Sequence, residues 1–204
     1  MWVKTIISTV LLTGLISTAS ANTSVYSKSS VWKVNDQQAF TALMSCDTAA
    51  SACVAKKMQQ LGASAEALSF SAAINYEGYL ANFQEKGTVD LGSVIYPFRA
   101  NTNTAYVLLN AQPKMINTEI ATVAGLEQDA SFKQLKKKYK NLEFWGTNAA
   151  FVKVNKLSSG ISYVFNYLLK DGCRACATPA SVQVAFRFNR QGKFLGTRFV
   201  KILQ

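Results

Sequence analysis

The stretch ISYVFNYLL, residues 161–169, carries the clearest structural signal in the chain. Large apolar side chains stand at every second position, with smaller or polar ones between them. This alternation places one face of a β-strand in a core and the other toward solvent. The pattern recurs over residues 182–188 and 194–203, and the tetrapeptide NRQG at 189–192 predicts the turn between them. The C-terminal part therefore predicts an antiparallel meander.

The same turn gives an expected register for the last two strands. If it sets the pairing, Phe186 faces Leu195 and Val182 faces Phe199 on the core side. Upstream, residues 89–98 and 104–110 flank a turn-rich tetrad and predict a hairpin. Short strands are expected at 142–145 and 150–154.

Helices dominate the part of the chain before the first hairpin. Asn35 and Gln38 form a capping-box pattern that begins one helix, and a second ends at Gly62. Ser64 can cap a third, which we expect to run to about Phe83. A fourth is expected over residues 129–141. The fold class predicted is α+β, with N-terminal helices packed on an antiparallel β-meander in a single domain.

The first residues have the order of a secretory signal peptide. Lys4 precedes a short apolar stretch, and Ala19-Ser20-Ala21 is a small-x-small cleavage site. The predicted organisation is a signal peptide over 1–21, a loose leader over 22–34 and one domain over 35–204. The apolar run is shorter than the ~20 residues that span a bilayer, and no later segment is long enough. We expect a periplasmic or secreted protein.

Composition restricts the chemistry. The chain has 22 Lys and Arg residues against 11 Asp and Glu, and no histidine. Catalysis by Ser-His or Cys-His pairs, His-ligated zinc and attached c-type haem are therefore excluded. The acidic residues lack the spacing of a glycosidase pair. We expect a protein that is not an enzyme and has no cofactor.

Four cysteines follow the signal peptide, and an even number in an exported chain predicts disulfides. Three pairings are possible, and we favour the two local ones, Cys46 with Cys53 and Cys173 with Cys176. The alternative is a zinc site made from all four, for which the spacings are not standard.

The Cys173-x-x-Cys176 segment lies between two predicted strands and should form a tight loop. It could exchange thiols as an oxidoreductase, present Arg174 to a partner, or serve as a structural clip. Redox sites usually place the first cysteine at a helix N-terminus, which this context does not predict.

A group of lysines on the fourth predicted helix is the second candidate site. They follow helical spacing and share one face, opposite Phe132, Leu135 and Tyr139. The face could be simply solvated, or it could bind an anionic polymer or envelope surface. Nucleic acid is disfavoured because aromatic side chains are not interleaved with the lysines. The residues concerned are Lys133, Lys136, Lys137 and Lys140.

Arg99 is the third candidate. It ends a predicted strand beside Asn101 and Asn103, and could line a pocket for a carboxylate or a sugar. The interpretation that we favour is a hairpin tip whose polar side chains satisfy the turn.

Three strings together resemble a family of uncharacterised secreted proteins of Gram-negative bacteria: YPFRAN at 96–101, DGCRACA at 171–177 and GKFLGT at 192–197. The resemblance covers most of the chain after the signal peptide and implies bacterial origin and export, but no activity. The chain is more loosely similar to periplasmic lysozyme inhibitors, which present a disulfide-closed loop to the enzyme. Their loops differ in residues and spacing. Loss of Lys4 with the signal peptide would leave a net charge of about +10, which would repel a cationic lysozyme.

The function predicted is that of an exported, non-catalytic binding or interaction protein with a basic surface for anionic envelope or host polymers. A secreted hydrolase inhibitor using the Cys173–Cys176 loop is the first alternative, and a thiol–disulfide oxidoreductase is the second.

Overall fold

The computed structural model describes residues 25–46 and 51–204. The predicted signal peptide lies outside the described residues. The described part is a mixed α+β fold with four α-helices, one 3-10 turn and two antiparallel four-stranded sheets. The sequence predicted one meander, whereas the structure has two, each with its strands in chain order.

The first sheet has the order β1-β2-β3-β4 and the second the order β5-β6-β7-β8. The strands of the first sheet are β1 Tyr79–Gln84, β2 Asp90–Ile95, β3 Thr104–Leu109 and β4 Met115–Asn117. Those of the second are β5 Leu142–Leu157, β6 Gly160–Asp171, β7 Ala180–Asn189 and β8 Phe194–Leu203. The helical elements are η1 Lys28–Ser30, α1 Asp36–Leu43, α2 Ser51–Gln60, α3 Ala65–Ala73 and α4 Ala130–Lys138.

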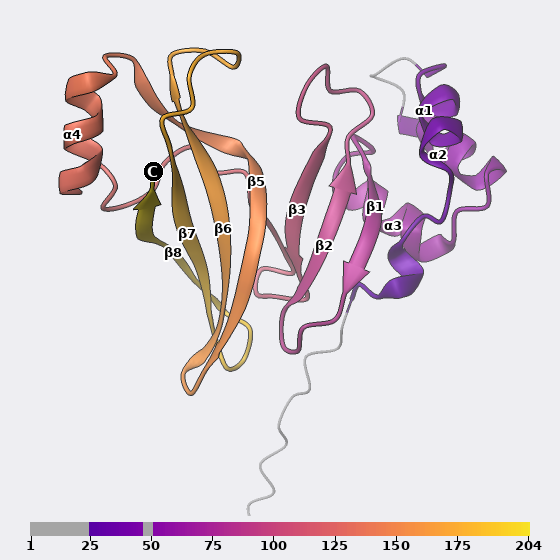
Figure 1. The fold of residues 1–204 in the computed structure, drawn as a ribbon. Coiled ribbons are helices and arrows are strands. Elements are labelled where there is room, and N and C mark those ends of the chain that lie inside the picture. Colours follow the sequence, from indigo (N-terminus) through magenta and orange to yellow (C-terminus); the bar gives the residue numbers. More distant parts are fainter. Residues whose placement is uncertain (1–24, 47–50) are drawn as a thin grey trace, which may run out of the picture.

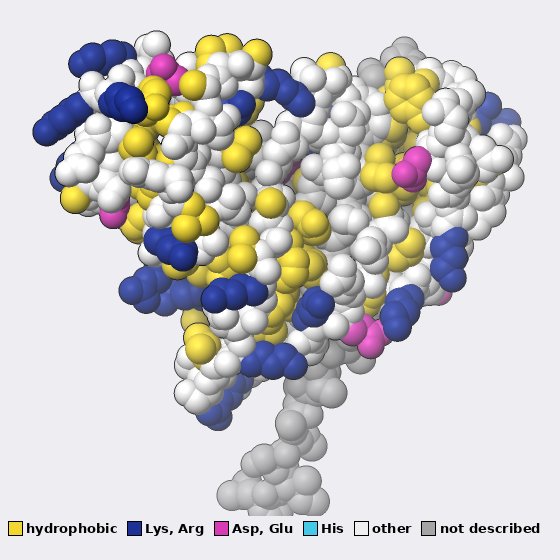
Figure 2. All heavy atoms as spheres, viewed as in Figure 1, with side chains coloured by type: hydrophobic (Ala, Val, Ile, Leu, Met, Phe, Trp, Pro, Cys, Tyr) yellow, Lys and Arg dark blue, Asp and Glu magenta, His cyan; other side chains and the backbone are white. Residues whose placement is uncertain are grey.

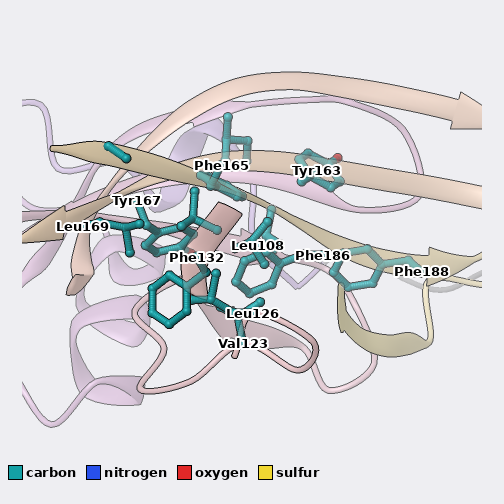
Figure 3. Close-up of a cluster of buried hydrophobic side chains, with 14 of the residues drawn as sticks. Leu108, Val123, Leu126, Phe132, Tyr163, Phe165, Tyr167, Leu169, Phe186 and Phe188 are labelled. Carbon is teal, nitrogen blue, oxygen red and sulfur yellow. The ribbon is translucent and has the colours of Figure 1, made fainter. Parts of the chain in front are cut away.

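Helices α1, α2 and α3 gather on one side of the first sheet, and the second sheet lies on its other side (Figure 1). Apolar side chains from both sheets form one buried cluster, in which Leu91 and Leu108 of the first sheet meet Phe165 and Phe186 of the second (Figure 3). Two smaller clusters lie between the first sheet and the N-terminal helices. Burial of apolar surface on both faces of the first sheet therefore joins the layers.

The predicted alternation in β6 is confirmed, and its core side chains are the odd-numbered ones. Two tyrosines of this row reach across to the other sheet: the Tyr163 hydroxyl donates to the Val89 carbonyl, and that of Tyr167 to the Thr118 carbonyl. Burial, more than any nearby charge, raises the pKa of both phenols above the ordinary value. Both side chains therefore stay neutral hydrogen-bond donors in the core.

Helix α4 follows the first sheet in the chain, where the fourth helix was predicted. The description of the fold as N-terminal helices on a meander was therefore too simple. Asp129 caps α4 by accepting from the Phe132 backbone N–H at 3.0 Å. Phe132 and Leu135 are buried against the second sheet, as their spacing predicted. The helix ends at Lys138 rather than near residue 141, because Tyr139 turns to an extended conformation.

The third predicted helix was too long. Helix α3 ends at Ala73, and both Asn75 and Tyr76 adopt left-handed backbone conformations, with φ of 55° and 59°. The buried Ser71 hydroxyl donates to the Gly78 carbonyl at 2.7 Å and closes the turn. The chain then enters β1, which pairs with β2. The apolar residues at 79–83 that were assigned to a helix therefore form an additional strand.

The described part of the predicted leader, residues 25–34, is not loose. Tyr26 and Trp32 are buried, with 8% and 2% of their surface exposed. The Asn110 side chain accepts from the backbone N–H groups of Val25 and Tyr26, both at 2.9 Å, and donates to the Tyr26 carbonyl at 2.8 Å. The segment is thereby fixed to the end of β3.

The predicted register of the last two strands was wrong. Phe186 faces Thr197 and Val182 faces Ile202, because the pairing shifts at two irregularities in β8. Likewise, the two short strands expected at 142–145 and 150–154 are parts of the single strand β5, which is irregular between them. No helix in residues 25–46 and 51–204 is long and apolar enough to cross a membrane.

Candidate binding surface

The outer face of the second sheet gathers basic side chains from three strands. Directly paired residues of a sheet share a face, and the even-numbered positions of β6 point away from the core that the odd-numbered ones fill. One row across the four strands consists of Lys153, Val164, Ala185 and Arg198. A neighbouring row consists of Ala150, Asn166, Gln183 and Lys201, and Arg187 lies opposite Ser162 in a third. We call Lys153, Arg187, Arg198 and Lys201 the basic sheet face.

All four side chains of the basic sheet face are exposed. None forms an ion pair within the part of the chain that the structure describes. Residues 142–204 carry nine Lys and Arg side chains against only Glu143 and Asp171. Figure 2 shows Lys and Arg side chains spread over the half of the molecule that the second sheet and α4 form. A surplus of uncompensated positive charge on one sheet creates a field that attracts anions.

An indole and two amides lie among these cations on the same face. Trp145 is half-buried and pairs with Leu168. This pair forms the row next to the one that contains Asn166 and Gln183. The Asn166 Oδ1 atom is buried and has no hydrogen-bond partner among the described residues. An unsatisfied acceptor of this kind requires an explanation, and a donor from a bound molecule is one.

The lysines of α4 are exposed, as the sequence predicted for a helix face. The Lys136 Nζ atom pairs with Glu127 at 3.1 Å, and it lies 5.0 Å from the centre of the Phe132 ring. Lys133 and Lys137 lie on the helix, whereas Lys140 follows its end. Four lysines therefore do not form one continuous helical stripe, and one of them is partly neutralised by an acid.

Both favoured cysteine pairings are confirmed: Cys46 is bonded to Cys53, and Cys173 to Cys176. All four thiols are used, so the zinc alternative does not fit, and residues 25–46 and 51–204 contain no cluster of potential metal ligands. Arg174 is exposed at the tip of the 172–179 loop between β6 and β7. The Lys170 Nζ atom, near the end of β6, donates to the Arg174 carbonyl at 2.7 Å and holds the loop against the strand. Neither cysteine of this loop lies at a helix N-terminus.

The structure places Arg99 in a local brace. Its Nη1 atom donates to both carboxylate oxygens of Glu119, at 2.9 and 3.0 Å. Its guanidinium carbon lies 3.6 Å from the centre of the Tyr96 ring, and Asn103 donates to the Arg99 carbonyl at 2.6 Å. These contacts engage the guanidinium group and stabilise the turn, so Arg99 is not part of the candidate binding surface.

Comparisons with protein-family models, curated proteins and solved structures found no match to this chain. The candidate surface therefore rests on geometry and charge alone.

The four cations of the basic sheet face were not among the residues predicted from the sequence. The signal was present, because Arg187 and Arg198 fall at outward positions of alternating strands. The five lysines within 133–140 form a denser run and therefore give a stronger local signal. The sheet register brings together residues that are as far apart in sequence as Lys153 and Lys201.

Proposed function

We propose that this protein is an exported, non-catalytic binding protein that holds an acidic polysaccharide on its basic sheet face. The observation that carries the proposal is the set of four exposed, unpaired cations on one side of a sheet whose other side is core. Regularly spaced anionic groups of a polymer could contact several of them at once. Release of counterions from the polymer would then favour binding.

A sugar polymer fits this face better than a nucleic acid does. Trp145 offers one flat apolar surface, against which the C–H face of a sugar ring can pack. The Asn166 and Gln183 amides can exchange hydrogen bonds with hydroxyl groups, and the buried Asn166 Oδ1 atom would gain a donor. Nonspecific binding of single-stranded nucleic acid instead uses several aromatic platforms for successive bases, and this face carries one tryptophan.

Export and single-domain folding belong to the same proposal. Two closed disulfides favour an oxidising compartment. Tyr26 is anchored by Asn110 only a few residues after the predicted cleavage site, so removal of residues 1–21 would leave the described contacts intact. We infer that the N-terminal helices and both sheets fold together, because the first sheet shares buried clusters with each neighbour.

The test is a titration of the purified protein with heparin, a sulfated polysaccharide, at about 50 and about 200 mM NaCl. We expect saturable binding that weakens steeply with salt. The variant Lys153→Gln, Arg187→Gln, Arg198→Gln, Lys201→Gln should bind at least ~10-fold more weakly, with a salt slope smaller by about one for each lost contact. Trp145→Ala should weaken the binding that persists at the higher salt concentration.

The matched control removes four exposed or half-exposed lysines elsewhere: Lys33, Lys56, Lys57 and Lys114, each changed to Gln. It has the same net charge as the sheet-face variant, so any difference between the two reports position. Equal losses in both variants would show attraction by net charge and contradict the proposal. Tighter binding of a DNA duplex than of heparin, insensitive to Trp145→Ala, would replace the polysaccharide by nucleic acid.

A further inference from the structure

A second, separate concentration of cations lies where three loops meet between the two sheets. The loops join β1 to β2, β5 to β6 and β7 to β8, and all three lie at the lower end of the molecule in Figure 1. They line a pocket of about 270 Å³, far larger than the ~30 Å³ that one water molecule occupies. We call it the inter-sheet pocket, and its polar lining residues are Lys86, Thr88, Lys156, Asn189 and Arg190.

The polar side chains lining this pocket can all donate hydrogen bonds, and no acidic residue is among them. Lys86 and Arg190 come from the β1–β2 and β7–β8 loops and Lys156 from the end of β5. None of the three forms an ion pair within the described residues. An adjoining hollow of about 470 Å³ shares Lys86 and Lys156 and includes Glu85 and Asp90. The Asp90 carboxylate is already engaged, since it accepts from the Lys86 backbone N–H at 2.9 Å and from Asn110 Nδ2 at 2.7 Å.

Several of these donors are held in place before any ligand arrives. The Arg190 Nε atom donates to the Ser158 carbonyl, which fixes the guanidinium and leaves its two Nη atoms for a ligand. The Asn189 Oδ1 atom accepts from the backbone N–H groups of Gln191 at 3.0 Å and Lys193 at 2.9 Å. Its Nδ2 group is thereby oriented as the remaining donor. Donors that are ordered in advance reduce the entropic cost of binding.

We propose that the inter-sheet pocket binds a tetrahedral oxyanion, a phosphate or sulfate monoester group. Three cations suit a group that carries up to two negative charges, and a guanidinium matches its oxygen atoms in a bidentate manner. The volume leaves space for the first carbon unit to which the group is attached. This inference is independent of the proposed function, because the pocket lies on the core side of β5 and the basic sheet face on the other. Lys156 pairs with Ile161 of the core, whereas Lys153 pairs with outward-facing Val164.

The experiment is calorimetric titration of the purified protein with sodium phosphate, sodium sulfate, glucose 6-phosphate and acetate, with sodium chloride holding ionic strength constant. We expect saturable binding of phosphate or sulfate and none of acetate. The stronger of the two inorganic anions identifies the group. Tighter binding of glucose 6-phosphate than of inorganic phosphate would show that the pocket also accepts an attached sugar.

Two double variants with the same charge change decide the location. Lys86→Gln/Lys156→Gln should weaken oxyanion binding at least tenfold, whereas Lys153→Gln/Lys201→Gln should leave it within about twofold. Neither Nζ atom in the pocket variant has a hydrogen-bond partner in the described structure, so its folding should be preserved, and a circular dichroism melt checks this. Arg190→Gln, a change in a different loop, should also weaken oxyanion binding. Absence of saturable binding by every oxyanion, or equal losses in both double variants, would overturn the proposal.

Heparin binding by the same variants separates this proposal from the preceding one. The pocket variant should retain heparin binding and lose the oxyanion, and the outer-face variant should do the reverse. Loss of both ligands in one variant would show that the two surfaces are one site, and the assignment of a separate pocket would then be wrong.

Discussion

At the residue scale, the Asn110 side chain makes four hydrogen bonds to residues that are distant in the sequence. It connects the backbone at Val25 and Tyr26 with the buried Asp90 carboxylate, and its own φ is +59°. Asparagine suits this position for two reasons, because its amide both donates and accepts and its backbone tolerates the left-handed region.

We therefore predict that Asn110→Gly lowers the free energy of unfolding by about 2–4 kcal/mol, because Asp90 and the Tyr26 backbone lose the hydrogen bonds that the Asn110 side chain makes with them. Asn110→Ala should cost about 1 kcal/mol more, because alanine is strained at this φ. Urea denaturation of the Gly variant measures the loss of the hydrogen bonds, and the difference between the Ala and Gly variants measures the backbone strain. A Gly variant within ~0.5 kcal/mol of the parent protein would show that these hydrogen bonds contribute little.

At the element scale, local patterns predicted the C-terminal strands, α1, α2 and the start of α4, because each carries its own periodicity or cap. The failures occurred where tertiary contacts override local preference. Residues 79–84 have apolar spacing compatible with either helix or strand, and pairing with β2 decides between them. The register of β8 depends on bulges near Gly196 and Val200, which alternation alone does not locate.

The irregular part of β5 has a steric role that can be tested at one glycine. The Ile120 backbone N–H donates to the Gly146 carbonyl at 3.0 Å, and a Cβ on Gly146 would lie only 1.4 Å from the Ile120 oxygen. The clash is with backbone, which cannot rotate aside. Gly146→Ala should therefore destabilise the protein by at least ~3 kcal/mol, at the upper end of overpacking costs.

The matched control for Gly146 is Gly196→Ala in β8. Gly196 has φ of +95° but no atom within 4 Å of an added Cβ, so this change reports conformational cost without a clash. We expect a loss of about 1 kcal/mol in thermal or urea denaturation. A Gly146 variant no less stable than the Gly196 variant would show that β5 can move away from residue 120.

At the scale of the whole molecule, the sequence predicted a basic surface at the lysines of residues 133–140, whereas the surface that we propose lies on the second sheet. Net charge is a sum over the chain, whereas a binding surface needs the cations on one side. Strand pairing within the second sheet brings Lys153, Arg187, Arg198 and Lys201 to one face. The packing of the two sheets instead places Lys86 of the first sheet beside Lys156 and Arg190 of the second. The lysines at 133–140 could be found from sequence because helical neighbours are close in the chain.

The dependence of stability on pH is also a property of the whole molecule, because no histidine is present and all four cysteines form disulfides. Stability should therefore be nearly constant from about pH 6 to about pH 9, and change where tyrosine titrates. Burial first, then the charge and hydrogen bond of Asp36, raise the pKa of Tyr79 to about 12, and burial raises those of Tyr163 and Tyr167 as well.

Above about pH 10 the unfolded chain releases these protons while the folded chain keeps them. The unfolded state then binds fewer protons, so the free energy of unfolding falls as pH rises. We predict a constant urea midpoint from about pH 7 to about pH 9 and a progressive fall toward about pH 11.5, with phenolate absorbance rising as the protein unfolds. Tyr79→Phe removes one such group and should make the fall shallower by up to about 1.4 kcal/mol per pH unit. If the two proteins instead lose stability in parallel through this range, Tyr79 titrates alike in the folded and unfolded chains, and its burial against Asp36 does not control the alkaline limit of the fold.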